Sequence, residues 1–248
     1  MFGAKKTKAA VFVDFDHWCI SMFQKYGAKP DVRAWYDSLC QSYDLREVYF
    51  FGDFSNPQLR SVKSDLRAIT DNVIDTQNSD GHNEKDYTDF IMLDQLYRKS
   101  ADRSVKTFVI FSGDGHFSLA ARYLKNECQK EVVVFGVRDA VSGRLRECAS
   151  RVVEMPQAEE LTRCYKRAVY RQISEVYAAN KRANLTFRTT ASVVAAKVGV
   201  DVETISNVMN EMIADGYIYQ TKKFVAQGNF LKVLKLDSEK IASVGFFE

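Results

Sequence analysis

The amino-acid sequence predicts an α/β protein, with a doubly wound, mainly parallel sheet followed by a small α+β domain. The first observation is that short apolar segments alternate with longer amphipathic segments over the first 155 residues. Apolar strands separated by helices are typical of a parallel sheet buried on both faces. The second observation is that this alternation stops at Met155-Pro156. We therefore expect one domain over residues 1–156 and a second over residues 157–248.

Six segments are predicted as strands because they are short, apolar and rich in β-branched and aromatic residues. They are residues 9–15, 47–52, 72–76, 106–112, 131–137 and 151–155. Amphipathic segments between them predict helices over residues 31–43, 57–70, 86–99 and 117–128. In an open sheet of this class, ligands bind beyond the carboxyl ends of the strands.

The chain after Pro156 is predicted to form three helices and a hairpin. The helices are expected at about residues 159–181, 191–198 and 202–214, and Asp201 is a natural N-cap for the last one. Residues 217–236 have the pattern of two strands around a polar turn. This order resembles a winged helix, in which Ala195, Gly199 and Ile205 match the small, turn and core positions of a helix-turn-helix.

Composition argues against a zinc site and a membrane anchor. The five cysteines form no CxxC pair, and the three histidines have no HxxxH spacing. No segment approaches the roughly 18 apolar residues of a membrane-spanning helix, and the N-terminal segment does not resemble a signal peptide. We expect a cytoplasmic protein with reduced thiols and no membrane association.

The net charge of +3 is distributed unevenly between the two predicted domains. Residues 1–156 contain 22 Lys+Arg and 22 Asp+Glu, whereas residues 157–248 contain 13 and 10. The second domain therefore carries the whole positive excess. An excess of this size permits nucleic-acid binding but does not establish it.

Carboxylates occur where a parallel sheet places its active site. Asp14 ends the first predicted strand, and Asp114 follows the strand at residues 106–112. A third segment, EKDYTDFIMLD, places Asp86, Asp89 and Asp94 at the start and middle of a helix. Clustered carboxylates repel one another unless a cation or proton intervenes. Because hard divalent ions prefer oxygen ligands, the sequence predicts a site for Mg²⁺ or Mn²⁺.

Such a site predicts hydrolysis of phosphodiester bonds. One cation would lower the pKa of a bound water, and a second would stabilise the leaving oxygen, so that neither a covalent nucleophile nor a catalytic histidine is needed. A strand-end aspartate is also a common helix N-cap, so the hypothesis depends on the joint placement of the acids. Asp16 and Asp86 are expected to be solvated or capping, and His17 and His116 to form hydrogen bonds beside the turns.

Three segments resemble the NYN domain, a branch of the PIN-like nuclease superfamily. They are VFVDFDH, KDYTDFIMLD and IFSGDGHFSLAARYLKNECQKEVVVFGV, in the family's order over roughly residues 8–155. The resemblance implies a Mg²⁺- or Mn²⁺-dependent ribonuclease. It implies that Asp14, Asp89 and Asp114 are catalytic, metal-binding acids and that Asp94 is a fourth metal ligand.

The sequence departs from the family's pattern at three places. His17 occupies the position of an asparagine, and His116 occupies the position of a second acid. Ala149-Ser150 replaces a late Ala-Asp step. With fewer acids, the site is expected to hold one metal ion firmly and a second one weakly.

Two other functions fit parts of the sequence. In a haloacid-dehalogenase-like phosphatase, Asp14 would be the nucleophile and Asp16 the general acid, although the Thr usual after the second acid is absent. The other alternative is a non-catalytic RNA- or DNA-binding regulator. In the second domain, Lys222 and Lys223 are predicted to contact a nucleic-acid backbone and Asn207 to read bases. RNA is favoured over DNA as partner, and the same domain could instead form a homodimer.

Overall fold

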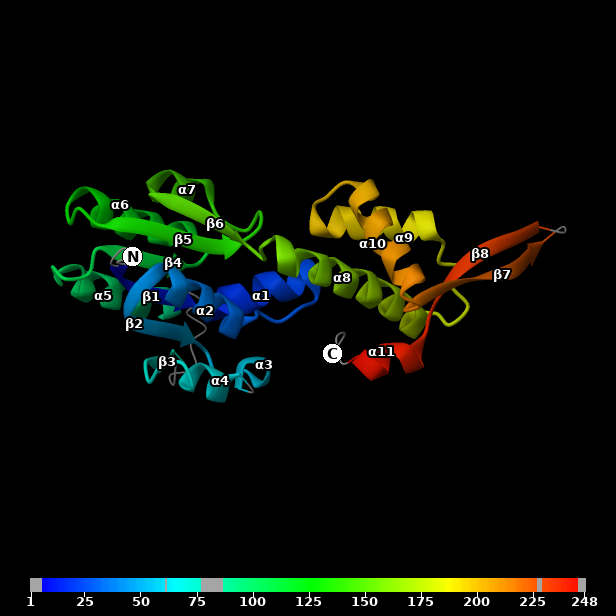
Figure 1. Cartoon of the computed structure of the whole chain (residues 1–248), viewed down its shortest axis with the longest axis horizontal. Helices are drawn as coiled ribbons and strands as arrows, with labels where there is room; N and C mark the ends of the chain where they lie inside the picture. Colours follow the sequence, from blue (N-terminus) through cyan, green and yellow to red (C-terminus); the bar gives the residue numbers. More distant parts are fainter. Residues whose placement is uncertain (1–5, 61, 77–86, 227–228, 245–248) are drawn as a thin grey trace, which may run out of the picture. The chain divides into compact units, whose positions relative to one another are not determined.

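The computed structural model describes residues 6–60, 62–76, 87–226 and 229–244. The chain folds into two compact units (Figure 1). The first contains residues 1–21 and 29–155, and the second contains residues 22–28 and 156–248. None of the described helices is long and apolar enough to cross a membrane.

Among the described residues, one six-stranded sheet forms the centre of the first unit, in the order β3-β2-β1-β4-β5-β6. Every neighbouring pair of strands is parallel. The prediction of a doubly wound parallel sheet is therefore confirmed. The strands are β1 (Thr7–Asp14), β2 (Tyr43–Gly52), β3 (Val73–Asp75), β4 (Thr107–Phe111), β5 (Glu131–Val137) and β6 (Arg151–Met155).

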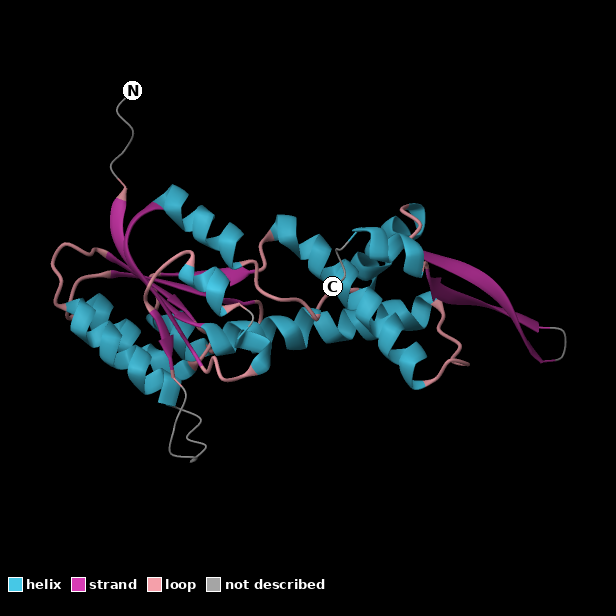
Figure 2. Ribbon diagram, turned by 90° about the horizontal axis from the view of Figure 1, so that it is seen from below, coloured by secondary structure: helices cyan, strands magenta, loops and turns pink. Residues whose placement is uncertain are grey.

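Helices cover both faces of this sheet (Figure 2). On one face, Trp18 and Trp35 pack against Phe111, with ring centroids 3.9 Å and 5.3 Å from it. On the other, Met92 packs in one buried cluster with Phe12 of β1. The helices are α1 (Phe15–Tyr26), α2 (Val32–Ser42), α3 (Pro57–Arg60), α4 (Lys63–Arg67), α5 (Tyr87–Ser100), α6 (Ser118–Asn126) and α7 (Gly143–Cys148).

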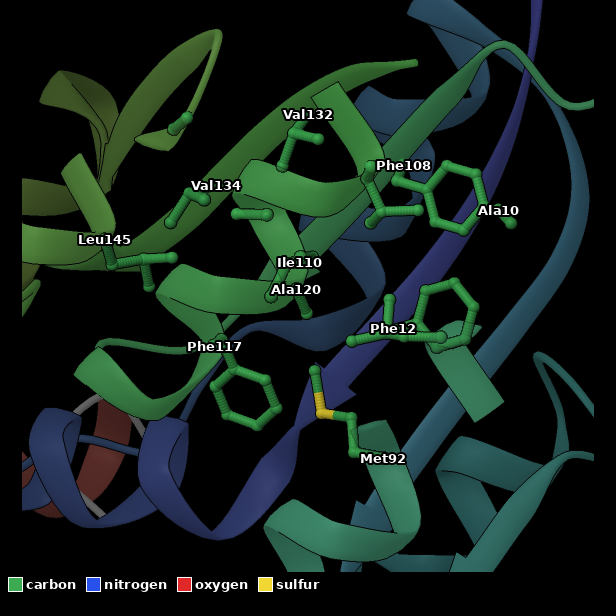
Figure 3. Packing of buried hydrophobic residues seen from close by; sticks show 14 of the residues in the cluster. Ala10, Phe12, Met92, Phe108, Ile110, Phe117, Ala120, Val132, Val134 and Leu145 are labelled. Carbon is green, nitrogen blue, oxygen red and sulfur yellow. The ribbon is translucent and has the colours of Figure 1, made fainter. Parts of the chain in front are cut away.

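Side-chain alternation along β1 decides which face carries Asp14. Ala10 and Phe12 belong to the buried cluster that includes Met92 of α5 and Phe117 (Figure 3). Because successive side chains of a strand point to opposite faces, residues 10, 12 and 14 share a face. The Asp14 side chain therefore points to the side of the sheet that α5 covers.

Two local predictions differ from the structure. The helix predicted over residues 57–70 is divided into α3 and α4, with Val62 preceding α4 and Ser61 outside the described residues. Helix α1 had no counterpart among the predicted helices. It buries Phe15, Trp18 and Tyr26 at 0–1% exposure on one stripe, but apolar Ile20 and Phe23 are 54% and 46% exposed outside that stripe, so the sequence shows no clear contrast between an apolar and a polar face.

The described part of the second unit after Pro156 contains three longer helices, an antiparallel hairpin and a short last helix. Helix α9 begins after a capping box formed by Thr186 and Thr189 and ends at Gly199, whose φ is 70°. The Asp201 side chain accepts a hydrogen bond from the Thr204 backbone N–H and so caps α10, as predicted. The elements are α8 (Ala158–Ala179), α9 (Phe187–Val198), α10 (Val202–Ala214), β7 (Ile218–Ala226), β8 (Asn229–Leu236) and α11 (Ser238–Val244).

The segment 22–28 belongs to the second unit through contacts with α8. The Tyr26 ring lies 6.3 Å from that of Tyr165. The Arg171 guanidinium lies 4.3 Å from the centre of the Phe23 ring and donates a 2.9 Å hydrogen bond to the Phe23 carbonyl. Gly27, at φ 64°, ends α1 directly beside Arg171.

Candidate metal centre

Asp14 is a buried acid at the carboxyl end of the central strand β1. Asp14 is only 5% exposed, and its side chain forms no ion pair with any described residue. Burial, with a smaller contribution from the negative charge of Asp89, raises the pKa of Asp14 to about 7. A buried carboxylate without a cationic neighbour is unfavourable unless it is protonated or binds a cation.

Two hydrogen bonds fix the orientation of the Asp14 carboxylate. The His17 backbone N–H donates to one oxygen at 3.0 Å. The Ser112 hydroxyl donates to the other, also at 3.0 Å, and accepts a 3.1 Å bond from the Asp114 backbone N–H. Because β1 and β4 are neighbours, Ser112 connects the two strand ends that carry the predicted acids.

The turn after β4 requires a glycine and positions Asp114. A Cβ on Gly113 would collide with the Ala140 carbonyl oxygen and with Nε2 of His17. Asp114 caps the short 3₁₀ helix at residues 115–117, because its side chain accepts a 2.8 Å hydrogen bond from the His116 N–H. Burial lowers the pKa of His17, while the charge of Asp114 partly opposes this effect.

Asp89 and His116 complete the cluster of ligand atoms. Asp89 lies in the first turn of α5. Nδ1 of His116 lies 3.3 Å from Oδ2 of Asp89 and 3.4 Å from Oδ1 of Asp114. One ligand atom from each of Asp89, Asp114 and His116 lies within 4.8 Å of the other two. Two carboxylates and an imidazole form a donor set suited to a divalent cation.

The exposure of these side chains increases from one end of the site to the other. Asp14 is buried, the Asp89 side chain is 13% exposed, and those of Asp114 and His116 are 39% and 60% exposed. The cluster is therefore closed at Asp14 and open to solvent at His116. Among the described residues, the solvent-exposed side of the site is the one that carries His116.

The other predicted acids lie elsewhere. Asp94 is half exposed and pairs with Arg98 one turn along α5, so the structure does not place it with the cluster. Asp16 accepts a 3.0 Å hydrogen bond from the Asp53 N–H, and burial, together with the charges of Asp53 and Asp75, raises its pKa. Asp86 lies outside the described residues.

The three residues predicted to contact nucleic acid lie in the second unit. Asn207 is exposed on α10, and Lys222 is exposed on β7. Lys223 is instead held by its own unit, because its Nζ donates hydrogen bonds to the Arg182 carbonyl (2.8 Å) and the Asn184 side chain (2.7 Å).

Comparison with known proteins assigns a family. The NYN domain model matches residues 8–156, the stretch that supplies Asp14 and the three residues of the cluster. The chain belongs to the NYN domain family. NYN domains are part of a nuclease superfamily that acts on nucleic acids, and NYN nucleases generally use divalent metal ions.

The structural comparison finds a solved protein with a similar fold. A crystal structure of a protein of unknown function from Vibrio parahaemolyticus matches with a TM-score of 0.53 and 24% sequence identity. The match covers 63% of this chain and 98% of that one. A search of curated proteins found no relative.

Two residues of this NYN centre received no ligand or positioning role from the sequence. His116, where the family pattern has an acid, places a nitrogen between two carboxylates. Ser112 positions Asp14 and Asp114. The signal for both residues lies in the SGDGH segment, which combines small turn residues with polar ones at the end of a buried strand.

Proposed function

We propose that this chain is a divalent-metal-dependent nuclease and that RNA is its substrate. The observation that carries the proposal is the cluster of Asp89, Asp114 and His116 beside buried Asp14, at the carboxyl ends of β1 and β4. The strand order reverses between these two strands, and in open α/β sheets ligands bind at such a point. Membership of the NYN family supports a nuclease over the phosphatase alternative.

Asp14, Asp89, Asp114 and His116 would hold Mg²⁺ or Mn²⁺. A bound ion of this kind lowers the pKa of a coordinated water and neutralises charge that develops on the phosphate. Other groups of the chain orient the carboxylates that would hold the ion. The Ser112 hydroxyl and the His17 N–H fix the Asp14 carboxylate, and the His116 N–H fixes that of Asp114.

The experiment is a cleavage assay with labelled single-stranded RNA and DNA in Mg²⁺, Mn²⁺ or chelator. Asp114→Asn and Asp89→Asn are each expected to lower the Mn²⁺-dependent cleavage rate by roughly 100-fold or more, the effect typical of removing one electrostatic catalytic group. Each substitution removes a negative charge that would hold the metal ion. Asp94→Asn is the matched control, since it removes one carboxylate from the same helix outside the cluster.

Each alternative has its own outcome in this assay. RNA binding without cleavage in any metal would favour the non-catalytic regulator. Hydrolysis of a small phosphomonoester but not of RNA would favour the phosphatase. Equal loss of activity in Asp94→Asn would show that the cluster is not the determinant.

In the second unit, the proposed nucleic-acid contact is one face of the β7–β8 hairpin. Lys222 lies opposite Lys232, and Phe224 lies opposite Phe230, with these rings 5.6 Å apart and 61% and 65% exposed. Like charges opposite each other destabilise a hairpin, so an anion on this face would relieve repulsion. Exposed aromatic rings beside lysines suit a backbone with stacked bases. Asn207 on α10 would add a base contact, as in a winged helix.

Location and assembly complete the proposal. All five cysteines are free thiols, which fits the reducing cytoplasm. A homodimer formed through the second unit is the competing role for that unit. Sedimentation at several protein concentrations, with and without RNA, would distinguish the two roles.

A further inference from the structure

A groove of about 540 Å³ adjoins the open side of the metal centre. Asp89 and His116 belong both to the cluster and to the wall of the groove. The groove extends from there over α6 and α7, so a molecule bound in it reaches the cluster. Its wall includes Phe90, Leu119, Arg122, Arg144, Glu147 and Cys148.

Two arginines give the far part of the groove a positive character. Arg122 on α6 and Arg144 on α7 are exposed, and neither pairs with an acid among the described residues. Nearby Arg146 differs, because it pairs with Glu154. Among the described residues of the wall, Glu147 is the one carboxylate beyond the cluster. Unpaired guanidinium groups beside a phosphate-cleaving centre are suited to bidentate contacts with phosphate.

Large apolar side chains line the same groove. Phe90 is 62% exposed and follows Asp89 directly, and Leu119 is 61% exposed on α6. Exposed apolar side chains that line a groove indicate a binding surface more than isolated ones do. A phenyl ring offers a flat face on which a nucleobase stacks, and this contact requires a base that is not already paired in a duplex.

We infer that this groove binds a single-stranded stretch of the nucleic acid on one side of the cleaved bond. In this arrangement Arg122 and Arg144 contact phosphates and Phe90 stacks a base. The inference rests on the proposed function in one respect, because it places the cleaved bond at the metal centre. Binding of the nucleic acid in the groove can be measured without cleavage. Charge complementarity favours a nucleic acid in this groove, because its negatively charged phosphates complement the two unpaired arginines.

The first test is protection of Cys148 in the full-length chain. With chelator present, iodoacetamide alkylation is followed at each cysteine by mass spectrometry, with and without a saturating single-stranded RNA oligonucleotide. We expect slower alkylation of Cys148, which lines the groove. Cys40 and Cys128 serve as internal controls and should react at unchanged rates. Unprotected Cys148 under saturating RNA would overturn the inference.

The second test measures affinity for the same oligonucleotide in chelator. Phe90→Ala is expected to weaken binding by roughly 5- to 150-fold, the range found for loss of one stacked base. The double variant Arg122→Ala/Arg144→Ala should reduce the slope of log affinity against log salt concentration by roughly 1.4. The control is Arg103→Ala with Lys106→Ala, which removes two exposed charges near the opposite end of β4.

The outcomes separate this inference from the nuclease proposal. Protection of Cys148 without metal-dependent cleavage would retain the groove and reject the nuclease. Cleavage that requires Asp114, combined with unchanged binding in both groove variants, would retain the nuclease and reject the groove. Loss of a dimer in Phe90→Ala, with unchanged RNA affinity, would make the groove an interface between copies and also reject the inference.

Discussion

Asp14 combines a position in the core with a charge-bearing side chain. The unfolded chain keeps such a carboxyl at its ordinary pKa of 3.8, whereas burial in the fold raises the pKa to about 7. The folded chain therefore binds the Asp14 proton more tightly than the unfolded chain does. This tighter proton binding stabilises the folded chain relative to the unfolded chain. The stabilisation is fully present below about pH 4 and is lost as the pH rises to about 7.

Replacing Asp14 by Asn should reveal this pH dependence. In chelator, Asp14→Asn is expected to gain free energy of unfolding relative to the wild type as the pH rises from 4 to 7. The gain approaches roughly 1.4 kcal/mol per pH unit at most and then levels off. Denaturant unfolding at several pH values measures it. A difference that does not change with pH would mean that Asp14 is not buried as described.

At the scale of single residues, the sequence predicted part of the geometry of the candidate site. Asp14 and Asp114 could be found because strand ends converge in a parallel sheet. The sequence could not place Asp94 reliably relative to Asp89. It lies five residues further along α5, and five residues rotate a side chain by about 140° around the helix axis, so the two side chains point in different directions. The contribution of His116 depends on the spacing between α5 and the turn after β4, which no local pattern encodes.

Among the elements, the predicted strands at residues 131–137 and 151–155 agree with β5 and β6, and the helix at residues 202–214 agrees with α10. Continuous apolar runs and a clear N-cap made these elements recognisable. Helix α1 could not be predicted in this way, because apolar Ile20 and Phe23 lie exposed outside its buried stripe and obscure the helical periodicity.

The end of α1 gives a prediction at the scale of an element. Gly27 has φ 64°, and a Cβ there would lie 2.6 Å from Cδ of Arg171. Gly27→Ala is therefore expected to cost about 1–2 kcal/mol in free energy of unfolding, from the left-handed backbone and from displacement of Arg171. Chemical denaturation of the full chain measures this.

The matched control for Gly27 is another glycine. Gly143 begins α7, and a Cβ there would meet nothing within 4 Å. Gly143→Ala should be neutral or stabilising by up to about 1 kcal/mol, because alanine favours the helix. Equal effects of the two substitutions would contradict the packing described around Arg171.

For the whole molecule, the acidic centre and the positive excess lie in different parts of the sequence. Residues 1–156 carry no net charge, and residues 157–248 carry +3. This division agrees with the proposed roles, in which the second unit retains RNA and the first cuts it. The two roles are separable by variants that change affinity but not the rate of cleavage at saturation.

Lys222→Ala and Lys232→Ala are each expected to weaken RNA binding and to reduce the salt slope by about 0.7–1. The cleavage rate at saturating protein should not change. Lys223→Ala is the control, because it removes the same charge from the next residue, whose Nζ is held by Arg182 and Asn184. Equal weakening by Lys222→Ala and Lys223→Ala would indicate a nonspecific charge effect and not a binding face.

The position of β1 in the sheet has a consequence for protein synthesis. It is the first described strand in the sequence, yet it lies between β2 and β4. Asp14 leaves the ribosome 100 residues before Asp114. The nascent chain therefore cannot assemble the cluster until β4 and the turn after it have emerged and paired with β1. A ribosome-bound fragment that ends before β4 contains Asp14 and Asp89 but neither Asp114 nor His116, so it lacks two of the side chains that would hold the metal ion.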